Sequence, residues 1–275
     1  MTRAATSIKA AQRLGLSAAL LAGSVLSDSA IEHYRGSFQN RAMYAPLVSA
    51  ALAVGAGLLA MRDPGGASRG GRSAVHALAA AVGLAGLGFH AYNVAKRPGG
   101  VSWLNLFYAA PVGAPAALTL AGALGWSAER LRAQPTRGNA RLFGMPADRA
   151  LATVSAVGLA GTAAEAALLH FRGAYHNPAM VLPVAAPPVA AGLLAWSACS
   201  PTPRARGLAR AWLKLTALLG LAGMGFHAYG VSRNMGGWRN WRQNLLNGPP
   251  IPAPPSFMAL AVSGLAALLL QGERR

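Results

Sequence analysis

The chain has little acidic character, a single cysteine and few charged residues of any kind. Only 7 of its 275 residues are Asp or Glu, and charged residues make up 12% of the sequence, against about 25% in an ordinary soluble domain. The single cysteine, Cys199, excludes a disulfide within one chain and a metal cluster bound through several cysteines. A sequence that is 53% hydrophobic is typical of a membrane protein.

Several enzyme motifs are also missing. The sequence has no Walker loop, no dinucleotide-binding glycine fingerprint on a βαβ unit, no His-Glu-x-x-His helix and no Gly-x-Ser-x-Gly elbow. It has no soluble domain large enough for a flavin, a molybdenum centre or an iron–sulfur cluster. We therefore expect a non-catalytic or electron-transfer subunit of an oxidoreductase complex, which relies on another subunit for chemistry on a soluble substrate.

Positive charge is in excess, but it is spread along the chain. The formal net charge is +18, yet the 25 Lys and Arg residues lie between long apolar runs and form no single basic face. We therefore expect no nucleic-acid partner. If alternate loops are assigned to opposite sides, 17 of the 25 cations fall on the side of the two termini. The positive-inside rule then predicts a multi-pass protein of the bacterial inner membrane with both termini cytoplasmic.

Eight apolar runs are each long enough to cross a hydrocarbon core of about 30 Å. Short polar stretches rich in Gly, Pro and Arg separate them, and no alternating strand pattern appears. The first run is preceded by three cations, as in a signal peptide, but it matches the fifth run, so we expect a retained helix. The runs cover residues 14–33, 43–61, 74–95, 104–126, 150–170, 178–198, 208–231 and 254–271.

An internal repeat relates the two halves of the chain at an offset of 137 residues. Residues 83–94 and 220–231 agree at 10 of 12 positions. The same offset pairs His33 with His170, Arg35 with Arg172, Asn40 with Asn177, Met43 with Met180 and Pro46 with Pro183. An even number of helices per copy gives both copies the same orientation. The predicted fold is an all-α integral membrane protein with eight transmembrane helices in two tandem, parallel-oriented four-helix repeats, residues 1–136 and 137–275.

Four of the six histidines are predicted to lie near the outer membrane surface. His90 is about 17 residues, or roughly 25 Å, from the cytoplasmic start of its helix, and His227 is its equivalent in the second repeat. His33 and His170 end the first and fifth helices on the same side. Each half therefore offers two imidazoles at one end of the bundle.

Each half also adds an acid and an arginine near these histidines. Asp28 and Glu165 are equivalent under the repeat and lie one or two turns before the helix ends, as the only acids expected at depth. They are predicted either to relay protons or to hydrogen-bond to a neighbouring helix. Arg35 and Arg172 lie where a helix meets water. They are expected to bind propionates, lipid phosphates or an acidic partner, or simply to anchor the helix end.

Two glycines precede the histidine in the third and seventh helices at i, i+3, i+7 spacing, on the face that carries the imidazole. The sets are Gly83, Gly86 and His90, and Gly220, Gly223 and His227. A face without side chains leaves room for a flat macrocycle, so His90 and His227 are predicted as iron ligands of a haem b. The alternatives are close helix packing, a quinone contact shared with Tyr92 and Tyr229, or a non-haem metal.

A long loop in the second half differs from its counterpart after residue 100. Residues 233–255 are rich in Trp, Arg and Pro. Trp and Tyr favour the membrane interface, so a contact with lipid is one explanation. Trp and Arg are also enriched at protein interfaces. We therefore expect Trp238, Arg239, Trp241 and Arg242 to dock an extracytoplasmic partner.

These features favour a membrane anchor and electron-transfer subunit of a bacterial respiratory complex. It would link an extracytoplasmic redox subunit to the quinone pool through a haem b or quinone site near the outer face. Eight helices in two four-helix bundles are similar in architecture to the membrane anchors of polysulfide-reductase-type complexes; no family motif is present, so no residue is carried over. The alternatives are a small-solute or ion transporter with its path between the repeats, and a cofactor-free scaffold for complex assembly.

Overall fold

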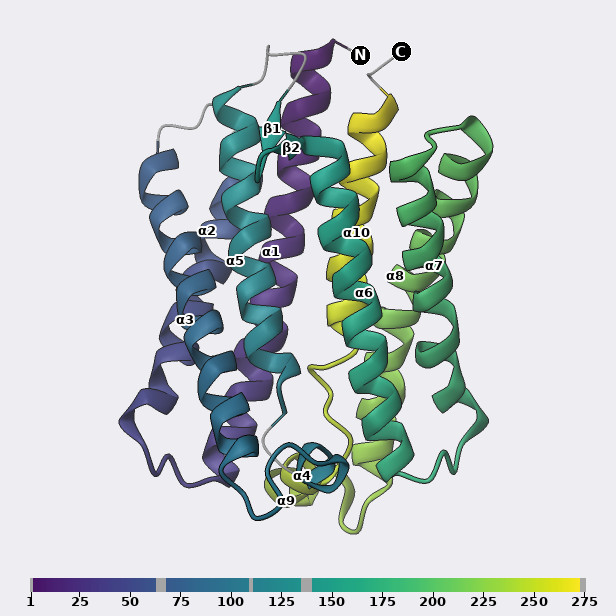
Figure 1. Ribbon diagram of the computed structural model, residues 1–275. Helices are drawn as coiled ribbons and strands as arrows, with labels where there is room; N and C mark the ends of the chain where they lie inside the picture. Colours follow the sequence, from purple (N-terminus) through teal and green to yellow (C-terminus); the bar gives the residue numbers. More distant parts are fainter. Residues whose placement is uncertain (1, 63–67, 109–110, 135–139, 273–275) are drawn as a thin grey trace.

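The computed structural model describes residues 2–62, 68–108, 111–134 and 140–272. Over these ranges the chain is built almost entirely of helices, of which eight are long (Figure 1). The long helices are α1 (Arg3–Arg35), α2 (Ala45–Arg62), α3 (Arg69–Ala95), α5 (Gly113–Ala133), α6 (Ala147–Arg172), α7 (Leu182–Cys199), α8 (Pro203–Arg233) and α10 (Pro255–Gln271). The prediction of an all-α protein is confirmed.

Short elements join the long helices. The helices α4 (Trp103–Tyr108) and α9 (Trp241–Asn247) lie across the end of the bundle opposite to the two termini (Figure 1). We call this the α4/α9 end and the opposite one the terminal end. The remaining short elements are the 3₁₀ helices η1 (Arg41–Tyr44), η2 (Pro178–Val181) and η3 (Gly237–Asn240), and the antiparallel strand pair β1 (Arg141–Leu142) and β2 (Met145–Pro146).

The apolar run predicted at 104–126 is not a single helix. It contains α4 and the first part of α5, which then continues past the predicted end to Ala133. Pro111 lies between the two helices, and Gly113 is the first residue of α5. Proline has no N–H to donate, and glycine is a poor helix former. The hydrophobicity of the run therefore did not reveal the break.

Within the described ranges, six helices are long and apolar enough to cross a membrane. They correspond to α1, α2 with η1, α3, α6, α7 with η2, and α8. The helix α10 is apolar but has only 17 residues, and the last turns of α5 carry Glu129, Arg130 and Arg132. These apolar helices indicate a multi-pass membrane protein.

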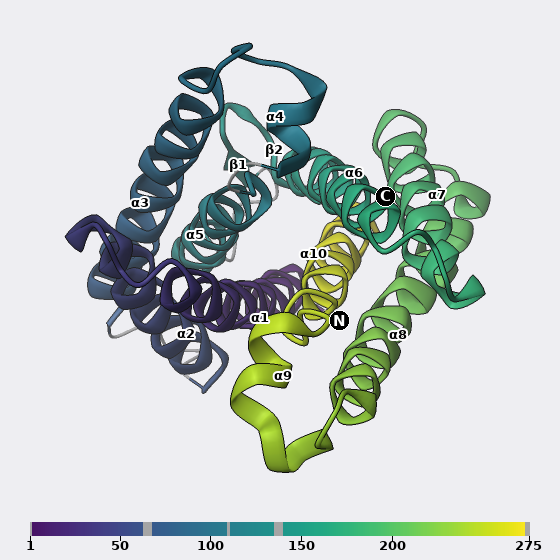
Figure 2. The same cartoon turned by 90° about the horizontal axis from the view of Figure 1, so that it is seen from below.

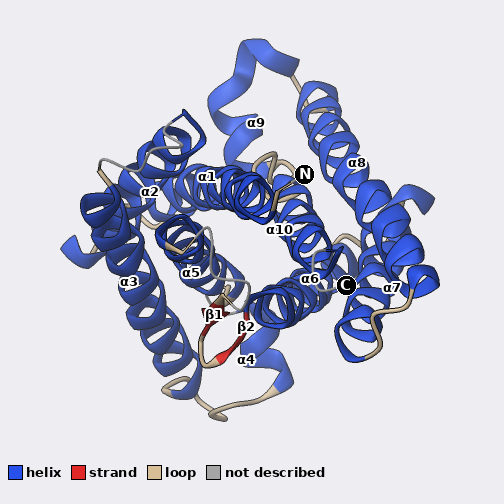
Figure 3. Cartoon of the chain, turned by 90° about the horizontal axis from the view of Figure 1, so that it is seen from above, coloured by secondary structure: helices blue, strands red, loops and turns tan. Residues whose placement is uncertain are grey.

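Four helices, α1, α5, α6 and α10, form the centre of the bundle (Figures 2 and 3). The pair α2 and α3 flanks them on one side, and α7 and α8 flank them on the other. The buried side chains are mainly Ala and Leu, so the helices approach closely. At Gly122, for example, a Cβ atom would lie 2.4 Å from the backbone N of Ala80.

Helix pairs within this centre differ in how closely they pack. Helix α1 packs along both α5 and α10, whereas α5 and α6 contact each other at few positions. Two serines of α1 lie within hydrogen-bond distance of the α10 region: Ser17 donates to the Ala259 carbonyl at 2.7 Å, and Ser24 Oγ lies 2.9 Å from Ser256 Oγ. Across the α5 and α6 side, Gly113 N donates to Glu165 at 3.1 Å.

The turns that follow α1 and α6 have the same backbone conformation. Each contains two consecutive non-glycine residues with positive φ, which is uncommon for such residues. They are Ser37 (58°) and Phe38 (48°), and Ala174 (55°) and Tyr175 (46°). In each turn an asparagine, Asn40 or Asn177, then accepts an N–H at 2.9 Å and begins a 3₁₀ helix.

Candidate functional site

The histidines at the ends of α1 and α6 make the same contact at the α4/α9 end. His33 Nδ1 lies 2.7 Å from the carbonyl oxygen of Met43, and His170 Nδ1 lies 2.7 Å from that of Met180. Each acceptor precedes a proline by three residues. Because proline has no N–H, it cannot close a 3₁₀ turn on that carbonyl. The imidazole supplies a donor in its place.

The histidines of α3 and α8 repeat this arrangement. His90 Nδ1 lies 2.5 Å from the Pro111 carbonyl oxygen, and His227 Nδ1 lies 2.7 Å from that of Pro250. A proline again follows each acceptor, here by four residues, where an α-helix would place its N–H donor. The Pro250 oxygen also accepts from Ala253 N at 3.2 Å.

All four contacts fix the same tautomer. A carbonyl oxygen only accepts, so Nδ1 of each neutral imidazole carries the hydrogen and Nε2 presents a lone pair. Within the described part of the chain, no Nε2 of these four side chains has a hydrogen-bond partner. His170 and His227 also lie within electrostatic range of each other.

The structure also brings the two acids near each other. Asp28 on α1 lies within electrostatic range of Glu165 on α6, as well as of Glu32 and Arg35. Glu165 Oε1 accepts the Gly113 N–H at 3.1 Å, at the first residue of α5. A carboxylate at a helix N-terminus satisfies a free donor and complements the helix dipole. For Glu165, hydrogen bonding between helices therefore accounts for at least one oxygen.

The contact with Glu165 requires a residue without a side chain at Gly113. A Cβ atom on Gly113 would lie 1.5 Å from Glu165 Oε2, so a larger residue would displace the carboxylate.

The two arginines lie at the α4/α9 end and contact the opposite half of the chain. Arg35 binds both oxygens of Glu32 at 2.8 and 2.9 Å and donates to the Leu246 carbonyl at the end of α9. Arg172 stacks on Phe107 of α4, with its guanidinium carbon 4.9 Å from the ring centroid. Both side chains thus take part in contacts between the two halves.

The tyrosines are placed away from these groups. Tyr92 and Tyr229 are 63% and 62% exposed on the outside of the bundle. Lys96 lies over the Tyr92 ring at 5.3 Å from its centroid. The structure therefore does not bring the tyrosines together with the imidazoles.

The four residues expected to dock a partner lie at the α4/α9 end. Trp238 and Arg239 belong to η3, and Trp241 and Arg242 begin α9. The two tryptophans are 51% and 58% exposed. Arg242 stacks over the ring of Tyr34 and donates to its hydroxyl, so α9 is held against α1.

The glycine faces expected to leave room for a macrocycle are filled. A Cβ on Gly83 would lie 2.5 Å from Thr119 N of α5, and one on Gly220 would lie 2.8 Å from Met258 N of α10. These glycines let neighbouring helices pack closely, which was the alternative explanation. Helices α3 and α8 also lie on opposite flanks of the bundle (Figures 2 and 3). One haem held by both His90 and His227 does not fit this arrangement.

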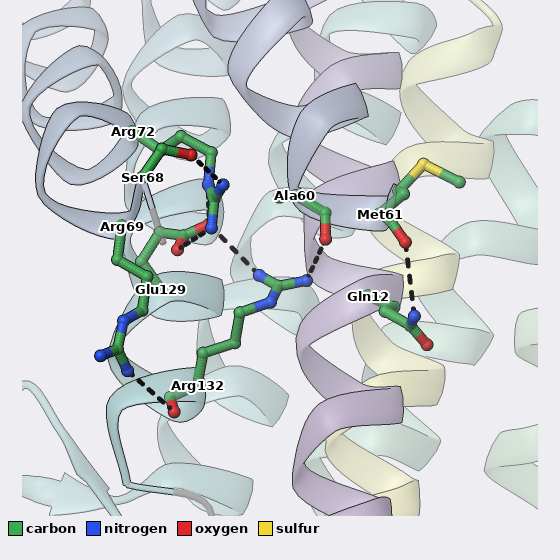
Figure 4. Close-up of polar contacts among 8 residues, drawn as sticks. All are labelled: Gln12, Ala60, Met61, Ser68, Arg69, Arg72, Glu129 and Arg132. Atoms are coloured by element: carbon green, nitrogen blue, oxygen red, sulfur yellow. Dashed lines mark hydrogen bonds and ion pairs between the residues drawn. The ribbon is translucent and has the colours of Figure 1, made fainter. Parts of the chain in front are cut away.

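A buried charged cluster at the terminal end was missed in the sequence (Figure 4). Glu129 of α5 pairs with Arg72 of α3, whose Nε and Nη2 lie 3.0 Å from its two carboxylate oxygens, and with Arg132 at 3.2 Å. All three are at most 4% exposed. Glu129 is therefore an acid buried in the bundle that the apolar runs did not predict.

This cluster also holds helix ends together. Arg132 donates to the Ala60 carbonyl at 2.5 Å, and Gln12 donates to the Met61 carbonyl at 3.3 Å, so both cap the end of α2 (Figure 4). Arg69 donates to the Arg132 carbonyl at the end of α5. Cationic donors commonly satisfy the last carbonyls of helices. The only available signal in the sequence was Glu129, an acid among the arginines of a predicted loop.

His76 lies one helical turn after Arg72 of this cluster. It is fully buried, and neither ring nitrogen has a hydrogen-bond partner in the described chain. Its ring lies where a Cβ on Gly125 would be, at 2.3 Å. His176 is exposed at the α4/α9 end, with Nδ1 3.0 Å from the Gly173 carbonyl.

No group of three or more His, Cys, Asp or Glu side chains in the described ranges has a geometry suited to a metal ion. No protein-family model, curated protein or solved structure matches the chain. Its class is therefore defined by its own fold, an all-α multi-pass membrane protein.

Proposed function

We propose that this chain is the membrane anchor and electron-transfer subunit of a bacterial respiratory oxidoreductase. It spans the inner membrane eight times, as two parallel four-helix repeats of residues 1–136 and 137–275, with both termini cytoplasmic. At the α4/α9 end, on the extracytoplasmic side, it docks a redox subunit and binds a quinone-class molecule. Asp28 and Glu165 are proposed to manage its protons.

One observation carries this proposal: at a single end of an apolar bundle, four imidazoles of long helices have Nδ1 anchored on a carbonyl of a different segment and Nε2 free. The exposed His176, by contrast, contacts only the Gly173 carbonyl of its own turn. An anchored Nδ1 is how proteins orient a histidine that uses its other nitrogen. The two acids, Asp28 on α1 and Glu165 on α6, lie within electrostatic range of each other at the same end. A quinone headgroup needs such hydrogen-bonding and proton-accepting groups beside an apolar environment for its tail.

The filled glycine faces favour a quinone over a haem. A quinone headgroup needs hydrogen-bonding atoms and much less space than a macrocycle. An absorption spectrum of the purified protein tests the haem hypothesis directly: a dithionite-reduced α-band near the b-type position would support it. We expect no such band and expect bound quinone to be recovered by organic extraction.

Quinone content of purified variants tests the site. We expect His227→Asn and His170→Asn to carry several-fold less quinone than the unchanged protein, because each loses a free Nε2. His176→Asn is the matched control, since His176 lies at the same end on a separate contact. Protein without quinone, haem and metal would count against a redox site and leave the scaffold hypothesis; solute flux into liposomes would instead support transport.

Docking of the redox subunit is tested by copurification from membranes. Trp238→Ala with Trp241→Ala removes the two exposed aromatic side chains of η3 and α9, and we expect the partner to be lost. Trp196 is 42% exposed near the terminal end of α7 and provides the control, Trp196→Ala. Unchanged association in the double variant would contradict this docking surface.

A further inference from the structure

The free nitrogens of His170 and His227 determine which form of a ligand they can bind. In both side chains Nδ1 lies 2.7 Å from a backbone carbonyl oxygen. Two acceptors cannot share a hydrogen bond without a proton, so in the neutral ring the proton stays on Nδ1. Nε2 can then only accept a hydrogen bond or bind a Lewis acid.

This tautomer is stabilised by the surrounding backbone. Each carbonyl precedes a proline, which cannot donate to it from the next turn. If the proton moved from Nδ1 to Nε2, Nδ1 would place a lone pair against the carbonyl oxygen. The Met180 carbonyl would then lose this donor, and the Pro250 carbonyl would keep only Ala253 N at 3.2 Å. Losing a donor at a buried or half-buried acceptor costs free energy. The arrangement therefore holds the lone pair of Nε2 available.

A metal ion is a poor occupant for this pair. Zinc sites use at least three protein ligands, and the described residues contain no group of three His, Cys, Asp or Glu side chains that could hold a metal ion. The remaining candidate for this pair is a ligand that donates hydrogen bonds to Nε2. The quinone ring offers only carbonyl acceptors, whereas its reduced form offers two hydroxyl donors.

We propose that His170 and His227 accept hydrogen bonds from the hydroxyl groups of a quinol and therefore select the quinol over the corresponding quinone. This inference rests on the proposed function, since it names the redox form that the same site prefers. Two hydrogen bonds that only the quinol can make are expected to favour it by about tenfold or more. The site would then receive reduced ligand from the membrane.

Binding of the two redox forms tests the selectivity. Full-length protein in detergent is dialysed at pH 8 against a short-chain benzoquinol, kept reduced under anaerobic conditions, or against its quinone. The expected result is a Kd for the quinol at least tenfold lower. The same measurement is made on His227→Asn and His170→Asn. An asparagine amide nitrogen can replace Nδ1 as a donor to the carbonyl, but it leaves no acceptor at Nε2.

The asparagine variants should keep their melting temperatures within a few degrees and lose the quinol preference. His176→Asn should keep it. Equal or tighter binding of the quinone, or a preference that persists in both variants, would overturn the inference while leaving the proposed function in place. Failure to bind either form would instead count against the proposed function. Independently, ¹⁵N spectra of histidine-labelled protein should show Nδ1 protonated; a protonated Nε2 would overturn the inference.

Discussion

A proline three residues after a carbonyl explains why each helix-end histidine is where it is. Met43 O can receive no N–H from Pro46, and His33 Nδ1 takes that place at 2.7 Å. The sequence showed His33 and Pro46 as repeated residues, but not that one satisfies the carbonyl near the other. This relation is between a helix and the turn after it, so no periodicity within either segment reveals it.

A double-mutant cycle on this pair is the first prediction. His33→Ala should lower the free energy of unfolding by about 1 kcal/mol, because it removes the donor to a partly buried carbonyl. In a Pro46→Ala background, where an N–H becomes available, the same change should cost clearly less. Unfolding is followed in detergent by circular dichroism. Equal costs in both backgrounds would contradict the role of the imidazole as a substitute donor.

The buried cluster at the terminal end gives the second prediction. Glu129→Gln removes the carboxylate that contacts the guanidinium groups of Arg72 and Arg132, and breaking a buried ion pair typically costs about 3–5 kcal/mol. Arg204→Ala is the control, because Arg204 is exposed at the start of α8 on the same end. Such exposed changes usually stay within about 0.5 kcal/mol. If Glu129→Gln melts like the unchanged protein, the cluster does not stabilise the fold.

At the scale of the elements, apolar length predicted most helices and missed one break. The runs at 74–95 and 150–170 lie within α3 and α6, because a long apolar segment flanked by Arg and Gly is informative on its own. The position of α4, the short helix before the break inside 104–126, depends on polar contacts. Asn105 of α4 is buried and donates to the carbonyls of Pro98 and Gly100 at 3.0 and 2.7 Å.

The loop that carries α9 is organised in the same way, although its sequence differs. Asn244 is also buried and donates to the carbonyls of Met235 and Gly237 at 3.2 and 2.8 Å. The second loop has two more residues before its asparagine than the first loop has. A comparison without gaps, at the offset of 137 residues, therefore does not pair Asn105 with Asn244. The composition of this loop was therefore a better guide to its exposure than to its structure.

Asn244→Ala is the third prediction. It removes the side-chain donor to the Gly237 carbonyl and leaves the Met235 carbonyl only the longer contact from Asn240 at 3.5 Å. We therefore expect α9 to lose order while the long helices remain folded. Hydrogen exchange should rise across residues 235–248 and stay unchanged in α1 and α6. Asn247→Ala is the matched control, since Asn247 is exposed in the same helix. Equal exchange in both variants would contradict the anchoring role of Asn244.

At the scale of the whole molecule, the two halves are connected by more than their central packing. Arg242 of α9 holds Tyr34 of α1, and Phe107 of α4 packs edge-on against Phe171 of α6 at 5.9 Å between ring centroids. Each short helix therefore rests on the long helix of the other half. The sequence indicated two alike segments, but contacts between them depend on side chains that differ between the segments, and no pattern within one segment reveals such contacts.

Because each short helix packs on a long helix of the other half, neither half has all its packing partners when it is alone. Residues 1–136 produced alone would leave α1 without α10 and α9, and residues 137–275 alone would leave α6 without α4. We expect each fragment by itself to be degraded in the cell, and both expressed together to accumulate and copurify as a noncovalent complementation pair. A fragment that accumulates alone at the level of the intact chain would show that it can mature independently.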